Sequence, residues 1–366
     1  MKKQLCILML ILSVVGSCPA QSLQVNSLIN LSEIAPKRAL AEIEQQLAQP
    51  EITNSERAML TSLKADTAYY LDQPDLILAA AKFALASNLL NPRWQVKTLI
   101  TMARGYEQMK DYKQYLATAE DAVRKSDQFD LKILKAAALI ERATAIALFD
   151  DFEKSSADLA LANRYLMALP DNFTKGVMQE RYTGALRLLS RFEDAIASQQ
   201  KSINIFQQTQ SVHFLSISHY NLGRVYESIG DVKSAIKQME RSYQLAQEDN
   251  NKLNQAFSLS RLASYQFKLN QTVEAKNTLN KAIQVADESP SFKVQFLARK
   301  DLAVLTCSNN VNLACQEALT HAISFAEKYR MSVDRSELMQ KLANVYFQNT
   351  QYQLAYQTLK QAIALR

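Results

Sequence analysis

The stretch NLGRVYESIGDVKSAIKQMERSYQLA, residues 221–246, decides the fold class of this chain. Its small and apolar residues recur at spacings of three and four, which places them on one face of a helix. Gly230 and Asp231 interrupt this pattern, so the stretch predicts two short helices joined by a tight turn. Gly223 and Ala235 are small enough to let the two antiparallel helices approach closely.

This pattern repeats with a period of 40 residues. Steps of 40 from Gly223, Ala235 and Ser242 reach small residues along three columns, and Tyr115 is the large exception. A fourth column, which opens each second helix, is mostly bulky and apolar. The columns stay in register over seven units without an insertion. A fixed period in this range predicts a solenoid of stacked helical hairpins.

The units resemble tetratricopeptide repeats (TPRs) in a 40-residue variety. In the last unit the family's signature places hold Leu342, Ala343, Tyr346, Tyr352, Ala355, Leu359 and Ala362. Departures from the usual residues occur at Tyr115, Ile146, Leu186, Gln266 and Thr306. The resemblance covers residues 53–366 and implies an all-α, right-handed superhelical solenoid. It implies no particular function, because the repeat is a general scaffold.

The chain divides into four predicted regions. They are a signal peptide (1–22), an N-terminal degenerate or capping helix (23–52), an atypical first hairpin (53–92) and seven regular repeats (93–366). Within the second region we expect a polar lead-in over 23–37 and a helix over 38–48, because Leu40, Ile43 and Leu47 share one stripe.

The N-terminus has the pattern of a bacterial secretion signal, with Lys2 and Lys3 before a short apolar core. Two processing routes compete. Cleavage after Ala20 would release a periplasmic protein, whereas a lipobox-like sequence ending at Cys18 would give an acylated, membrane-anchored lipoprotein. No other segment reaches the roughly 18 consecutive apolar residues of a membrane span.

Charge and motifs argue against several classes of function. The net charge of +6 is a mild bias, and export makes nucleic acid an improbable partner. Phosphate-binding loops and nucleophile motifs are absent. His213, His219 and His321 have no metal-ligand spacing. We therefore expect no enzymatic activity, no cofactor and no metal.

Two cysteines, Cys307 and Cys315, lie in one hairpin, where a disulfide is expected in an oxidising compartment. The alternative is two small buried thiols in a tight column.

In the family, the first helices of successive hairpins form the inner, concave wall that binds peptides. Carrying these places over implies a basic and aromatic lining of Lys97, Arg104, Glu107, Glu180, Arg187, Tyr220, Arg224, Glu227, Phe257, Ser260, Ser264, Phe267, Lys300, Gln340, Asn344 and Phe347. The leading hypothesis is an exported scaffold that binds a protein or peptide in this groove. The alternative is a sensory module, since such arrays are similar to periplasmic input regions of diguanylate cyclases and histidine kinases. Self-association through the C-terminal helix is a further expectation.

Overall fold

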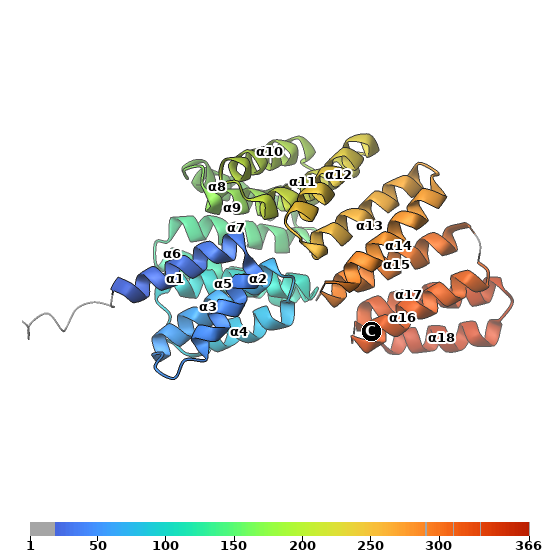
Figure 1. Cartoon of the computed structure of the whole chain (residues 1–366), viewed down its shortest axis with the longest axis horizontal. Helices are drawn as coiled ribbons and strands as arrows, with labels where there is room; N and C mark the ends of the chain where they lie inside the picture. Colours follow the sequence, from blue (N-terminus) through green and yellow to red (C-terminus); the bar gives the residue numbers. More distant parts are fainter. Residues whose placement is uncertain (1–18, 290, 310, 330, 366) are drawn as a thin grey trace, which may run out of the picture. The chain divides into compact units, whose positions relative to one another are not determined.

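The computed structural model describes residues 19–289, 291–309, 311–329 and 331–365. Within these ranges every regular element is an α-helix and no strand occurs. The helices pair into antiparallel hairpins that follow one another along the chain (Figure 1). The chain separates into two compact units, residues 1–167 and 168–366.

The described residues of unit 1 form four hairpins. Its helices are α1 (Pro19–Ile34), α2 (Pro36–Leu47), α3 (Asn54–Tyr70), α4 (Pro74–Ala86), α5 (Pro92–Gln108), α6 (Tyr112–Gln128), α7 (Lys132–Ala147) and α8 (Phe152–Met167). Several helix starts carry the expected signals: Pro opens α2, α4 and α5, and Thr53 and Glu56 form a capping box before α3.

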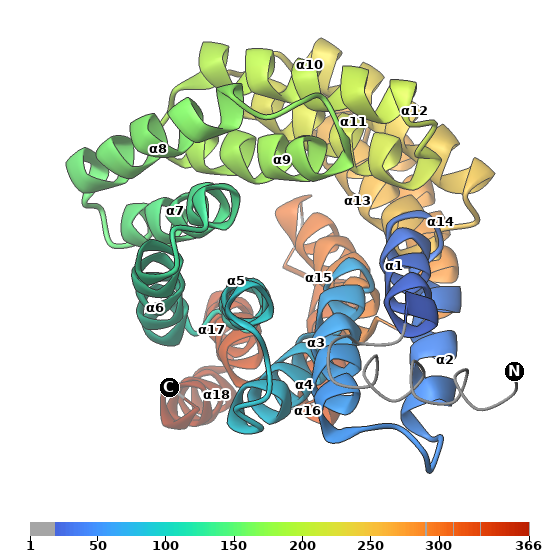
Figure 2. The ribbon, with the colours of Figure 1, turned by 90° about the vertical axis from the view of Figure 1, so that its left-hand side faces the viewer.

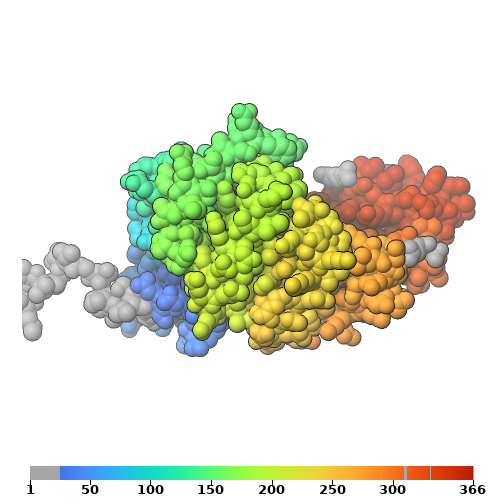
Figure 3. All heavy atoms as spheres, turned by 90° about the horizontal axis from the view of Figure 1, so that it is seen from above, coloured from blue at the N-terminus to red at the C-terminus, as the bar shows by residue number. Residues whose placement is uncertain are grey.

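Unit 2 contains five hairpins. Its helices are α9 (Phe173–Leu188), α10 (Phe192–Gln208), α11 (Val212–Ser228), α12 (Val232–Glu248), α13 (Lys252–Lys268), α14 (Thr272–Asp287), α15 (Phe292–Asn309), α16 (Leu313–Lys328), α17 (Ser332–Gln348) and α18 (Tyr352–Ala364). Within this unit α9 packs beside α10, and α11 beside α12 (Figure 2). Figure 3 shows successive hairpins as bands from green to orange.

Turns between helices use the left-handed backbone conformation, and in the regular hairpins it recurs at one fixed place. In the turns inside hairpins, φ is positive at Lys110, Asp150, Ser190, Gly230, Asn270 and Thr350. A residue in this conformation ends the preceding helix by bonding back to its last carbonyls. Only Gly230, with φ of 79°, adopts it without a steric cost from a Cβ atom. The period of the sequence thus reappears in the turns as well as in the core.

The small columns pack where the sequence predicted. Ala235 and Ser242 of α12 are fully buried, as are Ala275 and Ala282 one hairpin later. A Cβ atom at Gly223 would lie 3.3 Å from the carbonyl oxygen of Ala235 and 2.8 Å from the end of Met239. The close approach of α11 and α12 therefore depends on the missing side chain at this position.

The N-terminal region differs from the expected polar lead-in over 23–37. Helix α1 occupies most of that range, and its Leu28 packs against Ile43 of α2 and Leu60 of α3. The side chain of Ser32 bonds to Thr67, at 2.9 Å. Contacts with later helices thus stabilise α1, whose own apolar pattern is weak. The expected helix over 38–48 is α2, with Pro36 opening it.

The predicted signal peptide and Cys18 lie outside the described residues, apart from residues 19–22 at the start of α1. Within the described part of the chain, no helix combines the length and the apolar character that crossing a membrane requires.

Candidate functional site

Several contacts between neighbouring first helices join residues that are 37 or 38 positions apart and not 40. Arg104 bonds to Glu141, Tyr265 to Glu227 and Lys300 to Glu337 across such pairs. At these contacts the bonded residues are offset from equivalent repeat positions by two or three residues, or roughly 3–4.5 Å along the helix axis. Side chains that face each other are therefore not the ones at equivalent repeat positions.

A step of 37 from Arg187 reaches Arg224 and then Arg261, and these three residues form a candidate site that we call the arginine row. They come from α9, α11 and α13, three first helices packed in sequence within unit 2. All three side chains are half-buried. In the described part of the chain, no hydrogen bond or ion pair joins the guanidinium of Arg187 or Arg224 to an acceptor.

Repulsion within the row is visible in the pKa of Arg187. Burial, followed by the positive charges of Arg224 and Arg261, lowers this pKa from its usual range to about 10, and Glu227 and Tyr220 oppose the shift only in part. Arg187 stays protonated at neutral pH, so the row presents three positive charges at close range. Such an arrangement is relieved by an anionic ligand.

Glu227 is the main acid beside the row, and other groups already share it. Its carboxylate accepts hydrogen bonds from Lys268 Nζ at 3.0 Å and from the Tyr265 hydroxyl at 3.1 Å, and it lies 4.0 Å from Arg261. Burial alone would raise the pKa of Glu227, but Lys268 and Arg261 outweigh it and lower the pKa. Glu227 is thus ionised and engaged on the α13 side.

The row ends at a second carboxyl, Asp301 of α15. Burial raises the pKa of Asp301 to about 6, against the opposing charges of Arg261 and Lys300. The site therefore holds four cations (the row and Lys268) against two acids, a net charge of +2 when both acids are ionised. The rings of Tyr220 and Phe257, 6.1 Å apart, supply an apolar surface on α11 and α13.

Of the residues proposed from the sequence, the structure brings Arg187, Tyr220, Arg224 and Glu227 together. Arg261, Tyr265 and Asp301 were missed, because steps of 40 from Tyr220 and Arg224 lead to Ser260 and Ser264 instead. The signal that could have found Arg261 is the 37-residue spacing of three arginines in the sequence.

Arg104 is not the exposed lining residue that the sequence suggested. Only 6% of its surface is accessible, and its Nε donates to the fully buried Glu141 at 2.7 Å. The hydroxyl of Tyr115 donates to the other oxygen of Glu141, at 2.9 Å, and the ring of Tyr69 lies under the guanidinium. Arg104 thus belongs to an internal network of unit 1. Tyr115, the large exception among the small columns, is part of it.

The remaining proposed residues lie apart from the arginine row or have other partners. Lys300 bonds to Glu337 at 2.8 Å and lies 3.8 Å from Asp334. Phe267 packs against the apolar cluster around Ala263 and Leu279. Asn344 is exposed on α17.

Glu180, also expected to line the groove, is buried instead. Its carboxylate accepts hydrogen bonds from Gln199, Ser202, Ser218 and Asn221. Burial raises its pKa, and these four donors oppose the shift. The residue ties α9 to α10 and α11, which fixes the helix that carries Arg187.

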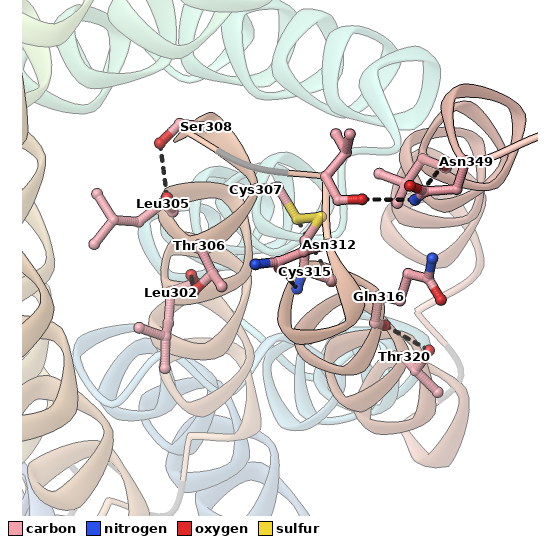
Figure 4. The surroundings of a disulfide bond; sticks show 12 residues. Leu302, Leu305, Thr306, Cys307, Ser308, Asn312, Cys315, Gln316, Thr320 and Asn349 are labelled. Carbon is pink, nitrogen blue, oxygen red and sulfur yellow. Dashed lines mark hydrogen bonds between the residues drawn. A yellow bond between two sulfur atoms is a disulfide. The ribbon is translucent and has the colours of Figure 1, made fainter.

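A disulfide joins Cys307 of α15 to Cys315 of α16 (Figure 4). The two Cα atoms are 4.7 Å apart, and the bond closes the turn of this hairpin. Asn312 caps α16 by accepting from the backbone of Cys315. Among the described residues, no group of three or more His, Cys, Asp or Glu side chains is placed to hold a metal ion.

Comparison with known proteins supports the type of repeat. The sequence model of the tetratricopeptide repeat family matches residues 178–248 and 217–288, which includes α11–α12 and the arginine row. No curated protein matches the sequence. The chain thus carries tetratricopeptide repeats.

Three solved structures are similar to the whole chain. A Rap protein complexed with competence and sporulation factor is 15% identical, with a TM-score of 0.62 over 94% of this chain and 97% of that one. The apo quorum sensor NprR from B. thuringiensis is 13% identical, with a TM-score of 0.56 over 94% and 97%. Aspartyl phosphate phosphatase F from Bacillus subtilis is 15% identical, with a TM-score of 0.54 over 96% of each chain. At these identities the likeness establishes the fold, a TPR-like helical solenoid.

Proposed function

We propose that this chain is a non-enzymatic scaffold that binds a peptide segment of a partner protein, and that the arginine row holds an acidic side chain of that segment. The observation that supports this is the pair Arg187 and Arg224, two half-buried guanidinium groups without a hydrogen-bonded acceptor in the described residues. Arginine binds carboxylates through two parallel hydrogen bonds, and such pairs recur as anchors of interfaces.

The surroundings of the row suit a peptide better than a small ion. Tyr220 and Phe257 offer aromatic surface next to the cations, and Tyr265 is held by Glu227. An extended or helical segment would place an acidic residue on the row and an apolar residue on this surface. The cationic excess also steers acidic partners to the site, and salt should weaken the association.

The proposal is tested with fluorescein-labelled peptides that differ only in a central Glu, Gln or Lys flanked by apolar residues. Anisotropy titrations should detect binding of the Glu peptides. Arg187→Ala/Arg224→Ala should weaken it by at least tenfold, because each charge-assisted hydrogen bond contributes about 1.5–3 kcal/mol. A pull-down from a bacterial periplasmic extract with the same variant should lose the natural partner.

The matched control is Arg191→Ala/Arg241→Ala, which removes two exposed arginines of unit 2 outside the row. It should leave the affinity unchanged. An equal loss in both variants would mean that net charge alone attracts the peptide. Equal binding of the Glu and Lys peptides would refute the assignment of the row.

A sensory module is the second candidate, and it shares the same binding step. Two similar solved structures favour it, since one is a Rap protein complexed with competence and sporulation factor and the other is a quorum sensor. A sensor would change conformation when the peptide binds. Hydrogen exchange with and without the Glu peptide separates the candidates: a scaffold protects the row alone, and a sensor alters protection in hairpins far from it.

Export remains part of the proposal and rests on residues 1–22 of the sequence. The mass of the mature N-terminus in a bacterial host distinguishes the two routes. A chain that begins at Gln21 supports soluble release into the periplasm, a lipid-modified Cys18 supports a membrane anchor, and an intact Met1 contradicts both.

A further inference from the structure

The last described helix, α18, exposes an apolar stripe whose central residue occupies a position that is buried in the earlier hairpins of unit 2. Leu359 is 43% exposed, whereas the residues one, two and three repeats earlier, Leu319, Leu279 and Met239, are at most 2% exposed. Tyr356 and Ile363, on the same side of the helix, are 68% and 62% exposed. We call these three residues the end face.

The interface that the end face continues is known from the rest of unit 2. Each earlier second helix is covered by the first helix of the following hairpin: α12 by α13, α14 by α15, and α16 by α17. Helix α18 packs against α17 through Ala355 and Ala362, and Ser336 of α17 bonds to the carbonyl of Ala362. This contact uses the side of α18 that faces its own hairpin and leaves the end face open.

We propose that a second copy of this chain covers the end face, with α18 packed antiparallel against α18 about a two-fold axis. The spacing of the three residues supports this occupant. Tyr356 precedes Leu359 by three positions and Ile363 follows it by four, so the stripe is nearly symmetric about its centre. In an antiparallel pair, Leu359 meets Leu359 of the second copy, and Tyr356 meets Ile363 of the second copy. A two-fold interface requires such self-complementarity.

The charge of α18 also favours a second copy. Its 13 residues, YQLAYQTLKQAIA, contain one ionisable cation, Lys360, and no acid. Lys360 lies about 100° around the helix from Leu359, at the rim of the face, where its stem packs while the ammonium stays in water. Two copies of α18 therefore meet without burying a charge. A tyrosine such as Tyr356, apolar with a polar end, is typical of interfaces.

Sedimentation velocity of the full 366-residue chain over a wide concentration range tests the proposal. The wild type should be a dimer that dissociates on dilution. Tyr356→Glu/Ile363→Glu should be monomeric, because it buries four carboxylates in the pair. Both substituted side chains are exposed in the chain itself, so far-UV circular dichroism should show an unchanged helix content.

The matched control is Val273→Glu/Leu313→Glu, which adds the same charge at two exposed apolar residues of α14 and α16. It should remain dimeric. A monomeric wild type would overturn the proposal and leave the end face to a helix of another protein. A dimer that survives Tyr356→Glu/Ile363→Glu would overturn it as well.

Amine cross-linking tests whether the two copies of α18 pair about a two-fold axis. In a mixture of unlabelled and isotope-labelled chains, the proposal predicts a mixed link between Lys360 of one copy and Lys360 of the other. A link from Lys360 to lysines of unit 1 instead would indicate head-to-tail association and contradict the two-fold pair.

Discussion

Units 1 and 2 are built from the same hairpin, yet the first helices of unit 1 and the first three of unit 2 arrange their charges differently. In unit 1 the charges are paired internally: Lys97 bonds to Asp66 at 2.8 Å, and Arg104 to Glu141 at 2.7 Å. In unit 2 the arginine row gathers three cations, and the nearest acid, Glu227, is shared with Lys268 and Tyr265.

The difference separates two uses of one scaffold. A buried pair such as Arg104–Glu141 holds neighbouring repeats in register, and breaking it leaves a buried charge. A row of like charges contributes nothing to stability and is retained at a cost, so it points to a ligand. Unit 2 is therefore the part of the chain in which we place binding, and unit 1 is a part whose first-helix face is occupied by its own side chains.

The largest expected effect is on the stability of unit 1. Glu141→Gln removes the charge that balances Arg104 and should cost about 3–5 kcal/mol, because both groups are buried. Chemical denaturation followed by circular dichroism measures the loss, and hydrogen exchange should place it in α5 and α7.

Asp121→Asn is the control for this prediction, since it breaks an exposed pair with Arg124 in the same unit. Its cost should stay below about 1 kcal/mol. Similar losses of unfolding free energy in Glu141→Gln and Asp121→Asn would show that burial does not make the Arg104–Glu141 pair more important for stability than an exposed pair.

The second-largest expected effect is the loss of stability when the disulfide of unit 2 is removed. Cys307→Ala/Cys315→Ala should destabilise the hairpin α15–α16 by about 2–3 kcal/mol, because the disulfide closes a short loop in the unfolded chain. Hydrogen exchange should rise in α15 to α17 and stay unchanged in unit 1. Reductant should have the same effect on the wild type and none on the variant. Mass spectrometry that finds two free thiols in the unreduced protein would contradict the prediction.

The third effect is a pH dependence in unit 1 that comes from Glu33. Burial raises its pKa from 4.5 to about 7, although Lys97 acts in the opposite direction. The folded state then binds a proton more tightly than the unfolded state, so this group's contribution to stability falls as the pH rises from about 4.5 to about 7. Allowing for partial exposure, the loss is about 1 kcal/mol.

Glu33→Gln should remove this dependence, and urea unfolding at pH 5 and pH 8 measures it. Glu51→Gln, at an exposed position of the same unit, should show the same change of unfolding free energy with pH as the wild type. An unchanged slope in Glu33→Gln would assign the pH dependence to other groups.

The smallest expected effect is on the unfolding free energy when the arginine row is changed. Arg187→Gln/Arg224→Gln should change the free energy of unfolding by no more than about 0.5 kcal/mol, since neither guanidinium loses a bonded acceptor. At low salt the variant should be slightly more stable than the wild type, and added salt should erase the difference. A loss comparable to that of Glu141→Gln would make the row structural and remove the contrast between the units.

Particular residues show how far sequence reasoning reached. Gly223, Ala235 and Ser242 revealed the hairpin because packing between helices restricts residue size, and size is visible in the sequence at a fixed period. The contacts of charged side chains are not restricted by residue size at a fixed period, so the repeat pattern does not predict them. Arg104 and Arg224 occupy the same position of the 40-residue repeat, yet one belongs to an internal ion pair and the other to an open cationic row.

The sequence by itself determined the helical hairpin and its repetition, and it placed Cys307 and Cys315 in one hairpin, because these depend on local spacing. Only the tertiary structure decided which charges meet, because several contacts between first helices are displaced by two or three residues from the 40-residue period. That displacement places Arg261 beside Arg224, and Glu141 beside Arg104. It thereby distinguishes the first-helix face of unit 1, whose charges pair with one another, from the arginine row of unit 2, which we propose binds a partner.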